Sequence, residues 1–339
     1  MNSITDTLKA SVISYCSTIG KDPLLVQGAG GNVSWKENDT LWIKASGTWL
    51  AQAAEKDIFV PVDLLHLRAA IESEDFSVTP RVRGESALRP SIETLLHALM
   101  PHRVVVHLHA IEILAHLVRE NCQTDFQSLI DESIHWIMVD FHKPGAALAT
   151  AVSTSLTEVS DANVVFLKNH GVVIGGADVA EVNHILTMLT TNLRIIPVSI
   201  CSQTQPTLPT EMDQYIPVQD ADVHQLALSM DLYNRLDRDW ALYPDHVVFL
   251  GERAYVYRAW NAFREENRVE SELPELVFIL DKGVFVKPTF SKAKLEQLRC
   301  YYDVLIRQKD QISIKALTQE QILVLLNWDA EQYRINLFN

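Results

Sequence analysis

Two apolar segments that read as buried strands each carry histidine, and this feature constrains the fold most. The first, residues 103–109, contains His107 and His109. Side chains two residues apart leave the same face of a strand, so we expect these two imidazoles to point together. The second, residues 163–174, carries His170 in a Lys-Asn-His-Gly turn. Three imidazoles on an apolar wall predict a divalent metal site, and three histidines with an open fourth position are typical of catalytic zinc.

A chance arrangement is the alternative, because the chain has 12 histidines among its 339 residues. A carboxylate upstream, Glu93, favours the metal site. Proline at position 90 and the apolar spacing after it predict a helix over residues 89–100, with Ser91 and Glu93 at its N-terminus. The free N–H groups of a helix N-terminus suit an anion. The alternative for Glu93 is a first-turn acid that only complements the helix dipole.

A glycine-rich turn, residues 28–31, precedes Asn32 but does not match the dinucleotide-binding fingerprint. Position 33 is valine, and the residues that follow resemble a strand rather than a helix. We interpret the turn as a loop whose backbone approaches a ligand, with Asn32 as an amide donor. The Ala-Ser-Gly segment 45–47 could close over the same anion. The alternative is two tight turns that join antiparallel strands.

Composition excludes several classes of partner. The net charge is −14, with 29 basic and 43 acidic residues and no basic run, so nucleic acid and anionic membrane surfaces are not expected as partners. No apolar stretch is long enough for a membrane span, and the N-terminus does not resemble a signal peptide. The four cysteines are scattered, which is typical of reduced thiols. These features predict a cytoplasmic protein.

The chain is long enough for two domains. We predict a catalytic domain over residues 1–200, a linker over 201–212 where polar residues and proline gather, and a smaller C-terminal α/β domain over 213–339. In the C-terminal part we expect strands at 246–250, 276–280 and 283–287, and helices at about 290–308, 318–327 and 329–337. The sequence does not predict the role of this part.

Four short segments together resemble the class II aldolase/adducin family. They are residues 30–34, residues 45–47, residues 90–93, and the histidine pair 107–109 with residues 169–171. The similarity covers roughly residues 5–198. The block that begins at Arg89 is most similar to the aldolase part of rhamnulose-phosphate aldolase/dehydrogenase proteins, although a Rossmann dehydrogenase half is not found here. The resemblance implies a three-layer α/β/α fold with a largely antiparallel central sheet, and a homo-oligomer, with a tetramer favoured.

The resemblance also implies roles for individual residues. His107, His109 and His170 would bind one Zn²⁺ per subunit. Glu93 would be the catalytic acid/base, with a pKa that a neighbouring apolar pocket raises. The residues that would hold a substrate phosphate are Asn32, Ser46, Gly47 and Ser91.

The implied reaction is retro-aldol cleavage of a ketose 1-phosphate through a zinc-stabilised enediolate. Two departures from the fuculose-phosphate aldolases leave the substrate open: Ile92 stands where a second serine often contacts the phosphate, and a tyrosine proton donor has no counterpart. Decarboxylase, epimerase or dehydratase activity on a phosphorylated sugar or sugar acid is an alternative. A binding module of the adducin type, without catalysis, is another, and the three histidines with Glu93 argue against it.

Overall fold

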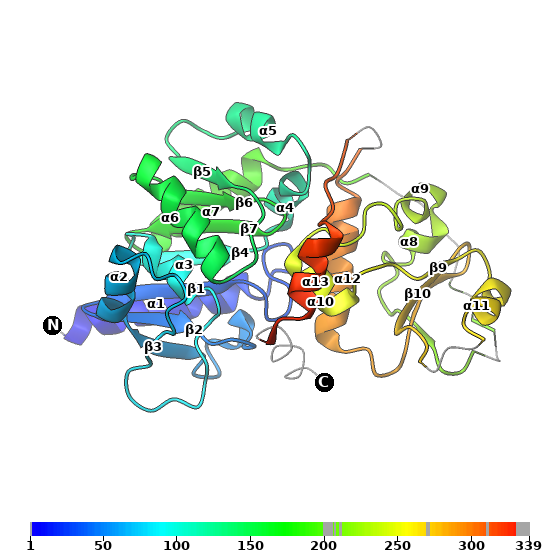
Figure 1. Cartoon of the computed structure of the whole chain (residues 1–339), viewed down its shortest axis with the longest axis horizontal. Helices are drawn as coiled ribbons and strands as arrows, with labels where there is room; N and C mark the ends of the chain where they lie inside the picture. The colour runs from blue at the N-terminus through cyan, green and yellow to red at the C-terminus, as the bar shows by residue number, and fades with distance from the viewer. Residues whose placement is uncertain are drawn as a thin grey trace.

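The structure, a computed structural model of the chain, describes residues 2–198, 206, 208–209, 212–268, 272–309 and 312–329. Two sheets with helices around them make up the molecule (Figure 1). In the described part of the chain, no helix combines the length and apolar character needed to cross a membrane. Most of the predicted linker 201–212 and of the helix predicted at 329–337 lies outside the described residues.

The larger sheet has seven strands in the order β3-β2-β1-β4-β7-β6-β5. All neighbouring pairs are antiparallel except β5 and β6, which are parallel. The strands are β1 (Asn32–Glu37), β2 (Thr40–Lys44), β3 (Phe59–Asp63), β4 (Val104–Leu108), β5 (Trp136–Val139), β6 (Val164–Leu167) and β7 (Gly171–Gly176). This confirms the expected largely antiparallel central sheet.

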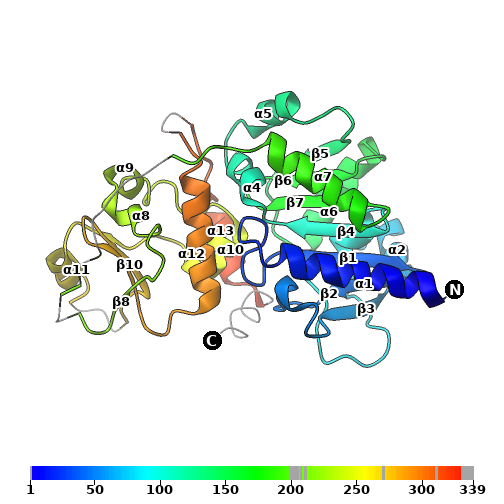
Figure 2. The ribbon, with the colours of Figure 1, turned by 180° about the vertical axis from the view of Figure 1, so that it is seen from behind.

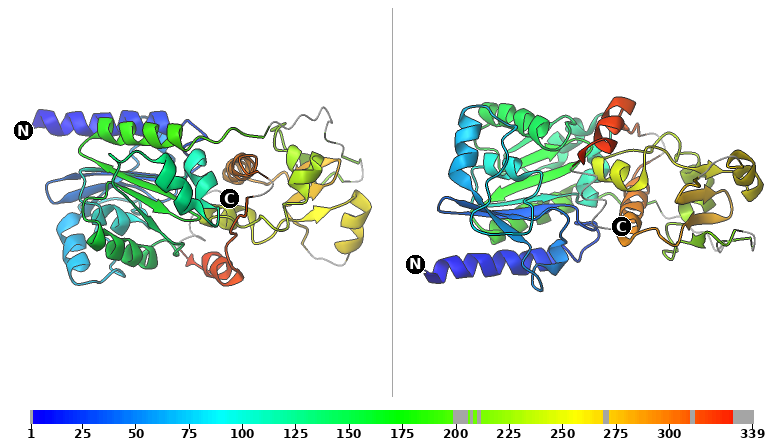
Figure 3. Two further views of the ribbon diagram at one scale, coloured as in Figure 1. Left: turned by 90° about the horizontal axis from the view of Figure 1, so that it is seen from above. Right: turned by 60° about the horizontal axis from the view of Figure 1, so that its bottom comes forward.

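Helices cover both faces of this sheet because its inner strands are apolar on both sides. Along β4, Val104 and Val106 belong to one core cluster and Val105 belongs to another. The helices on the first face are α1 (Asn2–Ile19), α4 (Ile111–Leu117), α5 (Cys122–Leu129) and α7 (Val179–Asn192). Those on the second face are α2 (Leu64–Glu72), α3 (Thr94–Leu99) and α6 (Ala146–Glu158). Figure 2 shows α1 and α7 across the near face, and Figure 3 (left) shows the sheet between its two helical layers.

The helix predicted over residues 89–100 begins later than expected. Helix α3 starts at Thr94, and residues 89–91 lie outside the helix. Pro90 forms a β-bridge with Ala45, and the N–H of Ser91 donates to the carbonyl of Lys44 over 3.2 Å. A residue before proline is disfavoured in the helical region, which explains why the helix does not begin there. The correction places Ser91 outside the helix and Glu93 at its N-cap position.

The smaller sheet has four strands in the order β8-β11-β10-β9. Its strands are β8 (Ile216–Pro217), β9 (Val256–Tyr257), β10 (Leu276–Ile279) and β11 (Gly283–Val286). The helices of this part are α8 (Gln225–Leu228), α9 (Met230–Tyr233), α10 (Pro244–Leu250), α11 (Trp260–Glu266), α12 (Lys292–Leu305) and α13 (Gln319–Leu326). The larger part also contains the 3-10 turn η1 (Leu50–Gln52). Strands β10 and β11 confirm two expected strands, and the C-terminal α/β character is as expected.

The strand predicted at 246–250 is wrong, because these residues belong to helix α10. Pro244 occupies the start of that helix, where its missing N–H costs nothing. Every residue of α10 is buried, so its short apolar run has no polar side that would reveal a helical period.

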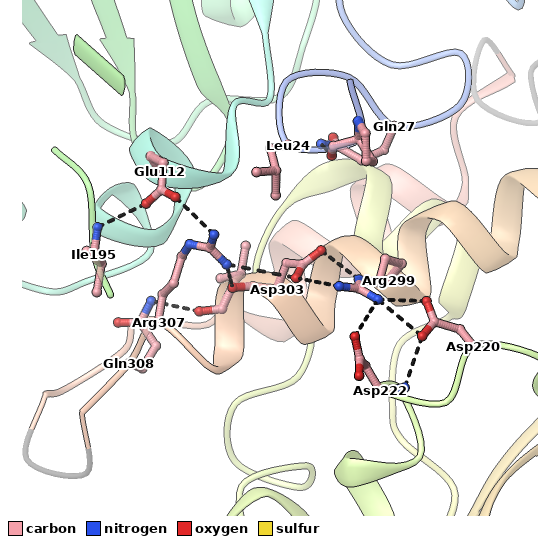
Figure 4. Close-up of polar contacts among 12 residues, drawn as sticks. Leu24, Gln27, Glu112, Ile195, Asp220, Asp222, Arg299, Asp303, Arg307 and Gln308 are labelled. Atoms are coloured by element: carbon pink, nitrogen blue, oxygen red, sulfur yellow. Dashed lines mark hydrogen bonds and ion pairs between the residues drawn. The ribbon is translucent and has the colours of Figure 1, made fainter. Parts of the chain in front are cut away.

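Helix α12 packs against the larger sheet's helix α4, α10 packs against α12, and α13 packs against α10. One core cluster joins Ile111 and Leu114 of α4 to residues of these three helices. Just after α12, Arg307 donates to Glu112 of α4 over 2.9 Å, and Glu112 also accepts from the N–H of Ile195 (Figure 4). The C-terminal part therefore contacts the element that directly follows the predicted metal-binding strand. The domain boundaries themselves remain a prediction.

Candidate active site

The three histidines come together at the ends of two central strands. His107 lies in β4, His109 lies just beyond its end, and His170 lies in the turn between β6 and β7. One ligand nitrogen from each ring lies within 4.8 Å of the others. The three residues are 0%, 6% and 5% exposed, respectively. Their convergence follows from the antiparallel pairing of β4 with β7, in which Leu108 is opposite Val172.

The donor atoms are spaced as ligands of a single cation. His107 Nε2 lies 3.1 Å from His109 Nε2 and 3.5 Å from Glu93 Oε2, and His170 Nε2 lies 3.5 Å from Glu93 Oε1. Zinc–nitrogen bonds of about 2.0–2.1 Å in a tetrahedral arrangement would separate ligand atoms by about 3.3 Å. Glu93 Oε1 is buried and has no hydrogen-bond partner among the described residues. The donor set and this unpartnered oxygen fit a divalent cation.

The imidazoles of His107 and His170 are in the neutral state that metal binding needs. Burial lowers the pKa of His107, and it lowers the pKa of His170 to about 3 despite the opposing field of Glu93. Neutral rings offer a lone pair, whereas protonated rings do not. His107 Nδ1 lies 3.1 Å from the carbonyl oxygen of Val172. A proton on that nitrogen donates to the carbonyl and leaves Nε2 free for a metal.

Glu93 is held by a chain of three polar side chains. Asn32 Nδ2 donates to Glu93 Oε2 over 2.8 Å, and Asn32 Oδ1 is in close contact with His97 Nε2. On its other side, His97 Nδ1 lies 2.7 Å from Ser34 Oγ. All four residues are buried. The amide of Asn32, expected to contact phosphate, is thus engaged with Glu93 and His97.

The pKa of Glu93 is shifted opposite to the expected direction. Burial alone would raise it, but His107, His170 and the amide of Asn32 lower the pKa of Glu93 to about 2. The sequence prediction considered the apolar neighbours of the carboxyl group and not the three rings and the amide that face it. Glu93 is therefore a carboxylate at neutral pH.

All four predicted phosphate-contacting residues lie together around one small pocket. Asn32, Ser46, Gly47 and Ser91 line it with Glu93, His109 and His170. The backbone N–H groups of Ser46 and Ser91 already donate to the carbonyls of Arg89 and Lys44. These serines therefore offer an anion their hydroxyl groups rather than their backbone. Gly47 has a φ of +75°, which favours glycine at that turn.

Sequence reasoning missed three residues of this site. Lys44 lines the pocket and donates to the carbonyl of Ala29 over 3.1 Å; its position at the end of an apolar strand beside Ser46 was a usable signal. Asp245 also lines the pocket but comes from the C-terminal part. Asn169 adopts a φ of +54°, and its amide nitrogen donates to the carbonyls of Leu242 and Lys315. Nothing in the local sequence signalled these last two roles.

Comparisons with known proteins agree with the fold. Residues 10–196 match the family described as the class II aldolase and adducin N-terminal domain. An uncharacterized oxidoreductase, YuxG, from Bacillus subtilis is 28% identical over 174 residues, which are 47% of this chain and 25% of that protein. The chain thus spans about a quarter of the length of this curated relative.

Two solved structures are also similar. The N-terminal class II aldolase domain of a conserved protein from Thermoplasma acidophilum is 24% identical, with a TM-score of 0.46; the match covers 54% of this chain and 90% of that one. A sugar-phosphate aldolase from Thermotoga maritima is 17% identical, with a TM-score of 0.44; the match covers 56% of this chain and 93% of that one.

Proposed function

Because the chain belongs to the class II aldolase and adducin family, we propose that it is a zinc-dependent carbon–carbon lyase that cleaves a ketose 1-phosphate. The observation that carries this proposal is the buried convergence of His107, His109 and His170 on the carboxylate of Glu93. A binding module without catalysis would have no need for this donor set in its interior. When bound, a divalent cation would polarise the substrate carbonyl as a Lewis acid.

Glu93 is the group we assign to proton transfer. Retro-aldol cleavage breaks the C3–C4 bond: a base takes the proton of the C4 hydroxyl, C4 leaves as an aldehyde, the bond's electron pair moves into an enediolate across C2 and C3, and C3 then receives a proton. Glu93 is ionised and fixed by Asn32, so it is ready to accept a proton near the metal-binding histidines. A positioned acid/base of this kind contributes about 10²–10⁴-fold to the rate.

We propose that the phosphate binds in the same pocket that His109 and His170 line. The hydroxyl groups of Ser46 and Ser91, the turn at Gly47 and the ammonium group of Lys44 supply donors and positive charge there. Anchoring the phosphate fixes the reacting carbon relative to Glu93, which lowers the entropic cost of reaching the transition state. Asn32 acts in this proposal through Glu93 rather than on the phosphate.

Decarboxylation, epimerisation and dehydration of a related substrate remain alternatives, since each passes through a similarly stabilised carbanion. We also propose a homo-oligomer, with a tetramer favoured, and a cytoplasmic location. A phosphorylated sugar is the proposed partner; nucleic acid and membrane are not.

The test combines metal analysis with product analysis. We expect purified protein to bind one zinc ion per chain and the His109→Ala variant to lose it, because a buried ligand is removed. The matched control is His184→Ala, which removes an exposed histidine of α7. Incubation with ketose 1-phosphates and with sugar-acid phosphates should yield dihydroxyacetone phosphate from the former only. Full zinc retention in His109→Ala would overturn the ligand assignment, and carbon dioxide or an epimer as product would overturn the assignment of aldol cleavage.

A further inference from the structure

The C-terminal part reaches into the pocket that the larger sheet forms. Pro244 and Asp245, the first two residues of α10, line it alongside Glu93, His109 and His170. Asp245 Oδ2 lies 3.4 Å from His109 Nδ1. Asp245 is 2% exposed, so a carboxylate of the C-terminal part is buried against an imidazole of the histidine cluster.

Residues on both sides of this contact pack closely against it. On the side of the C-terminal part, Gln297 of α12 directs its Nε2 to Asp245 Oδ2 over 3.4 Å. On the side of the larger sheet, a Cβ at Gly30 would lie 3.2 Å from Asp245 Oδ2 and 3.3 Å from His109 Nδ1. Those distances are tighter than ordinary contacts, so the glycine leaves the carboxylate and the ring room to meet.

The ring of His109 is oriented so that one nitrogen faces the histidine cluster and the other faces Asp245. Its Nε2 faces His107 Nε2, while its buried Nδ1, which makes no hydrogen bond among the described residues, lies 3.4 Å from a carboxylate oxygen of Asp245. A histidine ligand whose second nitrogen donates to a carboxylate is fixed in one tautomer and orientation, and it becomes a stronger base toward the metal. The same part of the chain also holds the turn of His170, because Asn169 donates to the carbonyls of Leu242 and Lys315.

We propose that Asp245 is a positioning residue for the metal site, and that the C-terminal part completes the site by orienting His109. The proposal rests on the metal binding described under the proposed function. Asp245 accepts the Nδ1 proton of His109, keeps Nε2 unprotonated and directs it toward Glu93 and the other two rings. The carboxyl groups of Glu93 and Asp245 both line the pocket. No tyrosine is among the described residues that line it.

The experiment measures zinc affinity by competition with a chromogenic chelator, using the full chain. We expect Asp245→Ala to weaken binding about 10–100-fold, the usual effect of removing such an outer carboxylate. Asp245→Asn keeps the volume and one acceptor oxygen, so its loss should be smaller. Asp281→Asn is the matched control: it makes the same change in the exposed β10–β11 turn, where asparagine tolerates the φ of +57°. Cobalt(II)-loaded protein gives a second readout, because a reoriented His109 changes the visible absorption bands.

The outcomes separate this inference from the proposed function. If the wild type binds zinc and both Asp245 variants stay within threefold of its affinity, Asp245 does not position His109 and the function stands. If the folded wild type binds no zinc, the proposed function and this inference both fail. Should Asp245→Ala not fold, by circular dichroism, the isosteric Asp245→Asn decides: affinity more than threefold weaker with an altered cobalt spectrum supports the role, and unchanged values overturn it.

Discussion

At the scale of single residues, the site combines groups whose charge states match their positions. Burial lowers the pKa of His107 and of His170 and keeps these two rings neutral, while the facing rings and the amide of Asn32 keep Glu93 ionised. The pKa of His97 is lowered to about 3 by burial, so His97 serves Asn32 as a neutral hydrogen-bonding ring. A carboxylate among neutral nitrogen ligands is the arrangement that attracts a divalent cation.

Glu93→Gln tests the division between binding and chemistry at this scale. The amide oxygen of glutamine can still accept from Asn32, so we expect the fold and zinc content to persist. Turnover should fall about 10²–10⁴-fold, because the amide is not a base. Steady-state kinetics and zinc analysis on the same preparation check this. Unchanged turnover would remove Glu93 from the mechanism, and loss of zinc would make it a ligand.

Residues could be predicted from the sequence where local geometry decides their position. His107 and His109 stand two residues apart on an apolar strand, and that spacing already implies proximity. The direction in which the pKa of Glu93 shifts could not be predicted in the same way, since it depends on rings that come from other strands. The role of Asp245 could not be predicted from the sequence either, because its place at the site depends on how α10 packs against distant helices.

At the scale of elements, prediction succeeded for the short buried strands of the larger sheet and failed for a short buried helix. Strands β4, β6 and β7 lie where the two apolar histidine-bearing segments predicted strands. Helix α10 was taken for a strand because burial on all sides erases the helical period. The start of α3 was misplaced because Pro90 forms a bridge to Ala45 instead of opening the helix.

Gly171, the first residue of β7, gives an element-scale prediction. A Cβ there would lie 2.4 Å from the carbonyl oxygen of Leu108 and 3.2 Å from His107 Cε1. Gly171→Ala must therefore separate β7 from the end of β4, and we expect it to destabilise the fold by about 1–3 kcal/mol and to weaken zinc binding. Urea denaturation and the chelator competition measure the two effects.

Gly84→Ala is the control for that substitution. Its φ of +77° strains alanine, but no atom lies within 4 Å of the added Cβ. It should lower stability by about 1 kcal/mol through backbone strain and leave zinc affinity unchanged. Equal zinc affinity in the two variants would show that the close approach of β4 and β7 is not needed for the site.

At the scale of the whole molecule, one continuous packed core connects the helices of the larger sheet to the smaller sheet. The core cluster that contains Leu114 of α4 extends through α10 and α12 to the smaller sheet. A row of ion pairs along α12 runs from Asp220 through Arg299 and Asp303 to Arg307 and Glu112 (Figure 4). Since Asp245 and the partners of Asn169 belong to this interface, its integrity and that of the site are coupled.

The acid sensitivity of this interface provides the last prediction. His246 of α10 is fully buried, with its ring 4.3 Å from that of Trp240 and 4.6 Å from that of Tyr301, centroid to centroid. Burial lowers its pKa from 6.5 to about 3. Between those values the unfolded chain binds a proton that the folded chain does not, so the free energy of unfolding rises with pH across this window. Lowering the pH from 7 to 5 should therefore cost about 2 kcal/mol through His246 alone.

His246→Asn removes the group that takes up this proton in the unfolded chain, and it keeps an acceptor near the N–H of Leu242. In the wild type that N–H donates to His246 Nδ1 over 3.3 Å. We expect the difference in unfolding free energy between pH 7 and pH 5 to shrink by about 2 kcal/mol, even if the variant is less stable at both values. Urea denaturation of zinc-free protein at the two pH values measures it. His184→Asn changes an exposed histidine in the same way and should leave the difference intact. An undiminished difference in His246→Asn would mean that His246 is already protonated in the folded interface, or that the interface opens before the protein unfolds, and either result contradicts a single tightly packed junction.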